Sequence, residues 1–290
     1  MPWSVYLRLG RVSNLPTVWT NVLAGVALAG VSVAPGPLAF LALALSLFYI
    51  GGMYLNDAFD REIDARERPE RPIPAGHVRA ATVFAIGYGL LAAGLAALAA
   101  EAAWAGQRGY ALTILSGLAL GGLIVFYDAR HKANPWSPLL MGLCRVLVYV
   151  TAALAVAGRL GAPVVIGATV LLSYLIGLTY VAKQENLAEL RNLWPLVFLA
   201  APFVYGIPEL TRAGIGAALY VLFLAWVCYG ISLLVRPGRA NIPRAVVSFI
   251  AGISLLDGLL MAGAGAPGAA AWSVGGFGLT LALQRYVRGT

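Results

Sequence analysis

Charged residues are scarce in this sequence. Asp, Glu, Lys and Arg make up only 11% of the 290 residues, whereas hydrophobic residues make up 60%. A water-soluble domain of this length needs a polar shell around its core, and so few charges cannot supply one. The scarcity therefore excludes an ordinary soluble globular protein. The mean hydropathy of +0.82 indicates that lipid is the solvent for most of the chain.

Cysteine and histidine are also rare, with two of each. Cys144 and Cys228 both fall in apolar stretches, so neither a disulfide framework nor a cysteine metal site is expected. His77 and His131 lie in polar segments without the spacing of a zinc site. The net charge of +8 is not arranged as a basic stripe with interleaved aromatic residues, so a nucleic-acid partner is not expected either.

Apolar stretches long enough to cross a bilayer, about 17 to 22 residues, are abundant. Backbone groups in hydrocarbon must be hydrogen-bonded within their own segment, and the alternation typical of a barrel is absent, so the fold class is all-α. We expect a single transmembrane domain over residues 1–290, a bundle of nine helices, or ten if a shorter run at 271–283 also crosses. The nine expected spans are 17–33, 38–56, 81–100, 110–127, 138–157, 163–182, 192–207, 214–235 and 246–264.

Positive residues are distributed unevenly between the two sides of this bundle. If the N-terminus is cytoplasmic, the loops on the opposite side hold only Arg108, Arg159 and Arg212, and nearly all other loop Lys and Arg residues stay inside. Positively charged loops remain in the cytoplasm. We therefore expect a multi-pass protein of the cell membrane whose N-terminus and whose loops after the second, fourth and sixth spans are cytoplasmic.

An acidic motif closes the second span. It reads Asn56-Asp57-Ala58-Phe59-Asp60-Arg61-Glu62-Ile63-Asp64, and its aspartates fall at i, i+3 and i+7. On one helix this spacing puts Asp57, Asp60 and Asp64 on one face. Like charges so close need a cation, and Mg²⁺ binds carboxylates together with phosphate oxygens. A solvated helix end with Asp/Arg pairs is the alternative, but charge at the edge of hydrocarbon is usually functional.

The motif continues into a second pattern, Arg71-Pro72-Ile73-Pro74-Ala75-Gly76. Together the two resemble the UbiA superfamily of intramembrane prenyltransferases, and Asn56 and Arg71 are among the matching positions. The resemblance implies a nine-helix fold around a central cavity and a magnesium-bound isoprenyl diphosphate. It further implies transfer of the prenyl group to an aromatic, quinone-precursor or other acceptor in the membrane, with release of pyrophosphate. Arg71 would donate hydrogen bonds to the diphosphate.

The end of the sixth span departs from the resembled family, which normally has a second acidic box there. Gln184 and Ala188 stand at the positions of its aspartates, and Glu185 and Glu189 keep the spacing one residue later. One residue turns a helical side chain by about 100°, so these glutamates replace the missing ligands only if the helix is re-registered. An exposed, salt-bridged pair is the alternative. Gln184 and Asn186 are candidates for hydrogen bonds to a substrate.

The loop between the fourth and fifth spans carries two further residues of the resembled site, Tyr127 and Lys132. With the altered sixth span, this pattern is similar to the divergent EboC-like branch. Arg145 lies inside the fifth span, so it needs a phosphate, Asp128 or a facing carboxylate as a partner. Snorkelling to the interface is the alternative.

Asn14 and Asn21 are expected to line the cavity, as similar positions do in the resembled family, although polar caps would also explain them. A CDP-alcohol phosphotransferase is excluded because it needs glycine after the second aspartate, where this chain has Arg61. A transporter or non-catalytic isoprenoid carrier that kept the diphosphate site remains open.

Overall fold

The computed structural model describes residues 3–104, 110–132, 134–184, 194–212, 214–235 and 241–287. Helices are the only regular elements over these ranges, which confirms the all-α class. The helices are α1 (Trp3–Leu9), η1 (Val12–Asn14), α2 (Leu15–Leu28), α3 (Pro35–Phe59), α4 (Arg61–Glu67), α5 (Ala80–Trp104), α6 (Tyr110–Arg130), α7 (Ser137–Ala157), α8 (Ala162–Ala182), η2 (Trp194–Ala200), α9 (Ala201–Arg212), α10 (Ile215–Leu234), α11 (Ile242–Gly263) and α12 (Pro267–Gln284).

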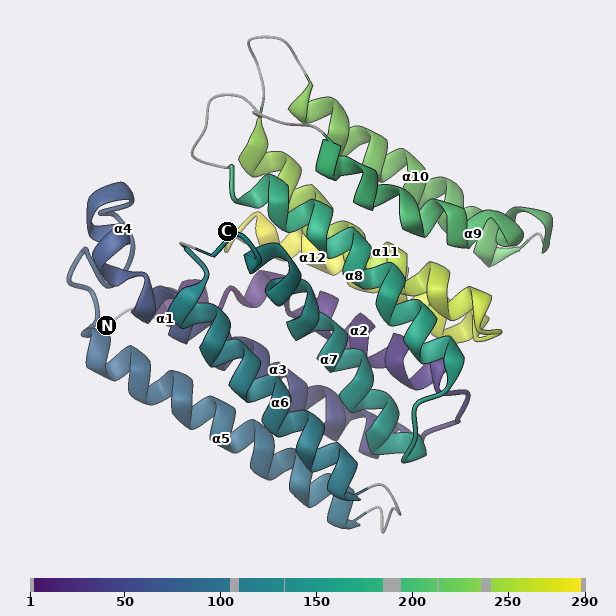
Figure 1. The fold of residues 1–290 in the computed structure, drawn as a ribbon, viewed down its shortest axis with the longest axis horizontal. Coiled ribbons are helices and arrows are strands. Elements are labelled where there is room, and N and C mark those ends of the chain that lie inside the picture. The colour runs from purple at the N-terminus through teal and green to yellow at the C-terminus, as the bar shows by residue number, and fades with distance from the viewer. Residues whose placement is uncertain are drawn as a thin grey trace.

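The long helices lie side by side in one bundle, and α1, α4 and the C-terminal end of α12 lie at the same end of it (Figure 1). Within the described residues, eight helices are long and apolar enough to cross a membrane. The other two members are α2, with 14 residues, and α12, with 18. α12 packs against both α11 and α2, but neither α2 nor α12 is among the eight helices that are long and apolar enough to cross.

The first expected span, 17–33, is shorter in the structure. The helix ends at Leu28, and Gly30 follows with a φ of +72°. The amide of Gly30 donates to the carbonyl oxygen of Ala27 and closes the last turn. A left-handed residue ends a helix whatever the hydropathy of the residues beyond it, so the apolar pattern overestimated the length of this span.

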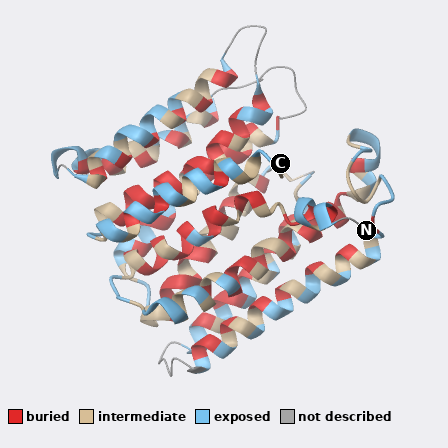
Figure 2. Cartoon of the chain, turned by 180° about the vertical axis from the view of Figure 1, so that it is seen from behind, coloured by how far each residue is buried: buried red, intermediate tan, exposed pale blue. Residues whose placement is uncertain are grey.

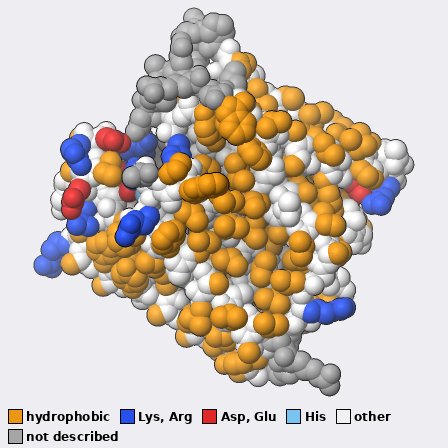
Figure 3. All heavy atoms as spheres, viewed as in Figure 1, with side chains coloured by type: hydrophobic (Ala, Val, Ile, Leu, Met, Phe, Trp, Pro, Cys, Tyr) orange, Lys and Arg blue, Asp and Glu red, His pale blue; other side chains and the backbone are white. Residues whose placement is uncertain are grey.

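Buried residues follow the inner faces of the helices, and α11 is the central one, with 83% of its apolar window buried (Figure 2). Hydrophobic side chains cover most of the outer face in Figure 3, and the charged side chains visible there lie toward its ends. Leu115, Val165 and Val204 are more than half exposed on this outer surface. Such a surface suits lipid tails.

Small residues allow α3 and α5 to approach closely. A Cβ atom at Gly51 would lie 2.9 Å from the carbonyl oxygen of Gly87, and one at Gly87 would lie 2.8 Å from the side chain of Leu55. Membrane helices lack a hydrophobic drive toward each other, so close backbone contact is a main source of their packing energy. The α3–α5 pair holds in place the helix that ends in the acidic motif.

Replacing Gly87 tests this packing. Gly87→Leu should lower the free energy of unfolding by about 1–3 kcal/mol because the new side chain overpacks the α3–α5 contact. Gly89→Leu is the matched control, since a Cβ at Gly89 meets nothing within 4 Å. The apparent melting temperature in detergent should fall for Gly87→Leu only. Equal melting temperatures for the two variants would contradict the packing.

Candidate active site at the mouth of the cavity

The acidic motif spans two helices that meet at Asp60. α3 ends at Phe59 and α4 begins at Arg61, which corrects the expectation of one continuous helix. The helical hydrogen bonds nevertheless continue, from the Asp60 amide to the Asn56 carbonyl at 3.0 Å and from the Asp64 amide to the Asp60 carbonyl at 2.8 Å. Asp57, Asp60 and Asp64 are all buried. Three buried carboxylates in one segment require compensating charge.

Two arginines from separate segments supply part of that charge. Arg71 Nη1 lies 3.2 Å from Asp57 Oδ1 and 2.9 Å from Asp64 Oδ2, so it bridges the two helices. Arg11, between α1 and η1, places Nη2 3.0 Å from Asp57 Oδ1 and 3.1 Å from Asn56 Oδ1. Asp57 is therefore held by two guanidinium groups at once.

The proline-rich loop positions Arg71. The Ala75 amide donates to the Arg71 carbonyl oxygen at 2.9 Å, the His77 amide donates to that of Pro72 at 3.0 Å, and Gly76 has a φ of +72°. Glycine adopts this left-handed conformation without steric cost. The Arg-Pro-Ile-Pro-Ala-Gly pattern thus forms a tight turn that folds Arg71 back onto the aspartates.

Asp60 is paired with the end of α6 and the residues after it. Lys132 Nζ lies 3.3 Å and His131 Nε2 lies 3.4 Å from Asp60 Oδ2. Burial acts to raise the pKa of Asp60, but the hydrogen bond from His131 and the charges of His131 and Lys132 outweigh it and lower this pKa. For Asp64 the balance is reversed, because burial raises the pKa more than Arg71 lowers it. Asp60 is thus stabilised in its charged form by His131 and Lys132.

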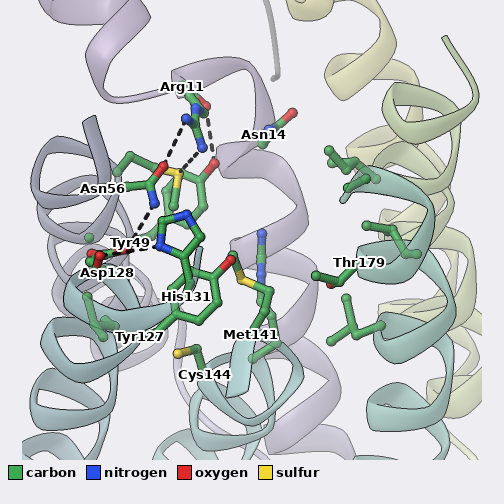
Figure 4. Close-up of a pocket in the computed structure, with 18 of the residues that line it drawn as sticks. Arg11, Asn14, Tyr49, Asn56, Tyr127, Asp128, His131, Met141, Cys144 and Thr179 are labelled. Carbon is green, nitrogen blue, oxygen red and sulfur yellow. Dashed lines mark hydrogen bonds between the residues drawn. The ribbon is translucent and has the colours of Figure 1, made fainter. Parts of the chain in front are cut away.

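α6 contributes a fourth carboxylate to this region. Asn56 Nδ2 donates to Asp128 Oδ1 at 3.2 Å, and the His131 ring stacks on Tyr127 with centroids 4.9 Å apart (Figure 4). His131 Nδ1 also lies 3.3 Å from the Asp128 carbonyl oxygen. The other carboxylate oxygen of Asp128, Oδ2, is buried and has no hydrogen-bond partner.

A cavity of about 460 Å³ opens beside these groups. Its polar side chains, several of which are drawn in Figure 4, come from the N-terminal segment, the acidic motif, α4 and the loop after it, α6 and the residues after it, α7 and the C-terminal end of α8. Its apolar lining residues are Val18, Leu45, Phe48, Leu120, Ile124, Val148, Leu175, Leu178, Val246, Ile250 and Ile253. The predicted central cavity is thus confirmed, and both polar and apolar side chains line it.

Arg145 lies on the cavity wall and has neutral partners. It donates to Asn21 Oδ1 at 2.9 Å and to Thr17 Oγ1 at 3.0 Å, and its guanidinium lies 5.2 Å from the ring centroid of Tyr49. The side chain therefore remains inside the bundle, and the snorkelling alternative is wrong. Asp128, which the sequence offered as one possible partner, is bonded to Asn56 instead.

A buried carboxylate on α11 anchors these neutral partners. Asp257 accepts a hydrogen bond from the Thr20 hydroxyl at 2.5 Å and another from the hydroxyl of Tyr149. Asn21 Nδ2 donates to both of its carboxylate oxygens, to Oδ2 at 2.8 Å and to Oδ1 at 3.0 Å. Asn21 consequently links Asp257 to Arg145 and is not among the residues that line the cavity, contrary to the expectation. Asn14 does line it, and accepts from Gln284 at 3.1 Å.

The remaining predicted residues divide into two groups. Tyr127 and Lys132 line the cavity together with Asp60, Asn56, Arg71 and Arg145, whereas Gln184 is buried outside the lining. Glu185, Asn186 and Glu189 lie outside the described residues. Neither Arg11 nor His131 was predicted from the sequence as a site residue. Arg11 was counted only among the positive residues that indicate the cytoplasmic side. The one sequence feature that could have marked Arg11 is its position shortly before the first apolar stretch.

The donor chemistry of the site fits magnesium. Within the described ranges no three His, Cys, Asp or Glu side chains already converge on one point. Mg²⁺ does not need such a triad, because it is usually bound by one or two carboxylates together with phosphate oxygens and water. Oxygen donors on the acidic motif and the unpartnered Oδ2 of Asp128 match that preference.

The Asp257 network yields a stability prediction. Asp257→Asn should lower the free energy of unfolding by about 2–4 kcal/mol, because an amide nitrogen then faces donors that now reach a carboxylate. Ser248→Ala on the same helix is the control, since the Ser248 hydroxyl only bonds back to the carbonyl of Arg244. Apparent melting temperatures in detergent measure the difference. An Asp257→Asn protein as stable as Ser248→Ala would refute the anchoring role.

Comparison with known proteins adds an independent line of evidence. The model of the UbiA prenyltransferase family matches residues 18–255. Digeranylgeranylglyceryl phosphate synthase from Methanopyrus kandleri is 38% identical over 93 residues, which are 31% of this chain and 34% of that protein. The chloroplastic chlorophyll synthase of Oryza sativa subsp. japonica is 31% identical over 144 residues, 46% of this chain and 38% of the synthase. The matched stretches thus span little more than a third of these relatives.

Two solved structures share the fold. An apo structure of a UbiA homolog from Aeropyrum pernix K1 superimposes with a TM-score of 0.64 at 17% identity, covering 85% of this chain and 94% of the homolog. A structure from work on digeranylgeranylglyceryl phosphate synthase in membranes gives a TM-score of 0.61 at 18% identity, covering 90% of this chain and 97% of the other. At these identities the likeness concerns the fold alone.

Proposed function

The chain belongs to the UbiA prenyltransferase family, and we propose that it transfers a prenyl group from an isoprenyl diphosphate to an acceptor in the membrane, with release of pyrophosphate. The observation that carries this proposal is the mixed lining of the cavity, in which charged side chains accompany apolar side chains from α2, α3, α6, α7, α8 and α11. An isoprenyl diphosphate combines the same two kinds of chemistry.

The polar side chains at the cavity supply what a diphosphate requires. Asp60 lines the cavity, whereas Asp57 and Asp64 are buried outside its lining. The three aspartates together are proposed to hold Mg²⁺, which when bound neutralises charge on the departing pyrophosphate. Arg71 and Lys132 would donate hydrogen bonds to the diphosphate oxygens, and Arg11 joins them in this proposal. Preorganised donors of this kind stabilise charge as it develops on a leaving group. The lowered pKa of Asp60 keeps its carboxylate available as a ligand at neutral pH.

The acceptor is proposed to bind on the side of the cavity where Arg145 lies. Thr17 and Asn21 fix the guanidinium, and the Tyr49 ring covers one face of it. A fixed arginine can orient an acceptor by hydrogen bonds to an oxygen atom near the reacting centre. Asn14, Asn56 and Tyr127 are proposed to complete the polar contacts to the substrates.

The sequence around the end of α8 is the reason to test the alternative of a non-catalytic isoprenoid carrier. Gln184 stands where the resembled family has an aspartate. Glu185, Asn186 and Glu189 are also proposed to contact the substrate or the metal, and they lie outside the described residues. A protein that lost turnover but kept the diphosphate site would bind an isoprenyl diphosphate without releasing pyrophosphate. Binding and release must therefore be measured separately.

Substitution of the acidic motif tests the catalytic proposal. Asp57→Asn and Asp60→Asn should each reduce Mg²⁺-dependent release of pyrophosphate from an isoprenyl diphosphate by at least about 100-fold, because each removes charge that holds the cation (about 2.7 kcal/mol of transition-state stabilisation). Glu62→Gln is the control, since the Glu62 side chain is 76% exposed and pairs only with Arg61. The assay uses purified protein in lipid vesicles with a donor panel and a membrane extract, and mass spectrometry identifies the prenyl adduct.

Unchanged release in both aspartate variants would contradict the assignment of the acidic motif. Binding of the donor to the wild-type protein without any release would favour the carrier.

The proposed orientation places α4 and the loop after α6 in the cytoplasm. In a protein whose Cys144 and Cys228 have been replaced by alanine, Glu62→Cys should react with an impermeant thiol reagent only when the cytoplasmic face is accessible. Leu160→Cys, in the loop between α7 and α8, should react only from the other side. The positive-inside distribution of Lys and Arg is the reason. The reverse labelling pattern would overturn the topology.

A further inference from the structure

Asp128 has an unexplained oxygen atom. The residue is 4% exposed, and its Oδ2 is buried without a hydrogen-bond partner among the residues that the structure describes. Its Oδ1 accepts a single bond, from Asn56. A carboxylate has about four acceptor positions, so most of the capacity of Asp128 is unused at a place where water is largely excluded.

Asp128 differs in this respect from the other carboxylates nearby. Asp57 and Asp64 are paired with arginine, and Asp60 is paired with Lys132 and His131. No lysine, arginine or histidine side chain of the described ranges forms an ion pair with Asp128. A buried carboxyl group with neither a cation nor a full set of hydrogen bonds is unfavourable, and a bound cation would relieve that cost.

The position of Asp128 indicates what that partner is. Asp128 lines the cavity together with Asp60, Arg11 and Lys132. One imidazole ring, that of His131, contacts both the backbone oxygen of Asp128 and the carboxylate of Asp60. Asp128 therefore belongs to the same part of the cavity lining as charges proposed to hold the diphosphate.

We propose that Asp128 is a ligand of the divalent cation, and that it holds the ion together with Asp60 against the diphosphate. This inference rests on the proposed function for the identity of the bound diphosphate. Two carboxylates, phosphate oxygens and water satisfy the coordination that Mg²⁺ prefers. Asn56 acts as a positioning residue, because its amide fixes Oδ1 and leaves Oδ2 for the metal.

Metal binding by the full-length protein tests the inference without an activity assay. Mn²⁺ replaces Mg²⁺ as the probe, and its affinity is measured by electron paramagnetic resonance in lipid nanodiscs, with inorganic pyrophosphate present. Asp128→Asn should weaken Mn²⁺ binding by at least about tenfold. Glu101→Gln is a matched control. Like Asp128, Glu101 is buried, with 3% exposure, and has an oxygen without a partner among the described residues, but it lies on α5 outside the cavity lining.

Glu101→Gln should bind Mn²⁺ as the wild type does. Asp60→Asn should weaken Mn²⁺ binding as Asp128→Asn does. In the double variant, Mn²⁺ affinity should fall by less than the product of the two single-variant factors, since both residues hold the same ion. Equal Mn²⁺ affinity in the wild type and Asp128→Asn would overturn the inference, as would a wild type that binds no Mn²⁺.

Stability provides a second readout. Without metal, Asp128→Asn should melt at the same or a higher temperature than the wild type, because an uncompensated buried charge has been removed. Mn²⁺ with pyrophosphate should raise the melting temperature of the wild type more than that of the variant. A variant that melts well below the wild type, or does not fold, would make Asp128 a structural carboxylate and overturn the inference.

Failure of the inference is distinguishable from failure of the proposed function. A wild type that releases pyrophosphate, together with an Asp128→Asn variant that retains Mn²⁺ affinity, would refute the metal role of Asp128 alone. A wild type that binds Mn²⁺ through Asp128 but catalyses no prenyl transfer would refute the proposed transfer and leave the metal site intact.

Discussion

Burial of negative charge at the boundary of the bilayer is the constraint on which the site depends. Asp57 and Asp64 sit at the junction of α3 and α4, where an uncompensated carboxylate would be unfavourable. Their compensation comes from Arg11 and Arg71, which belong to segments on either side of α2 and α3 in the chain. Charge pairing thus draws the N-terminal segment and the proline-rich loop onto the same end of the bundle and shapes the mouth of the cavity.

A second buried carboxylate organises the cavity deeper in the bundle. Asp257 on the central helix α11 accepts hydrogen bonds from side chains of α2 and α7. One of these donors, Asn21, also accepts a hydrogen bond from Arg145. The two polar layers lie on either side of Tyr49, whose hydroxyl is near the Arg11 carbonyl and whose ring is next to Arg145. The fold therefore presents cationic groups at two separated positions of one cavity.

The sequence was sufficient for the features that follow from local pattern. Hydropathy predicted the helices, and the acidic spacing predicted that Asp57, Asp60 and Asp64 would lie on one face. It was insufficient where partners come from distant segments: a lone arginine at position 11 looks like a topology signal, and nothing local shows that Asn21 faces Asp257. The first expected span is shorter in the structure because Gly30 has a left-handed backbone conformation, which hydropathy does not predict. The role of Asp128 depends on an oxygen without a partner, which only coordinates reveal.

We propose that the buried carboxylates, with Arg11 and Arg71, form the site of a metal-bound diphosphate whose apolar chain occupies the cavity. An experimental structure of the protein in nanodiscs with Mg²⁺ and a non-reactive isoprenyl thiolodiphosphate tests this proposal. The diphosphate should lie between Lys132 and the acidic motif, with the chain along Phe48 and Ile253. A diphosphate bound elsewhere, with Asp57 and Asp64 contacting only the two arginines, would contradict it.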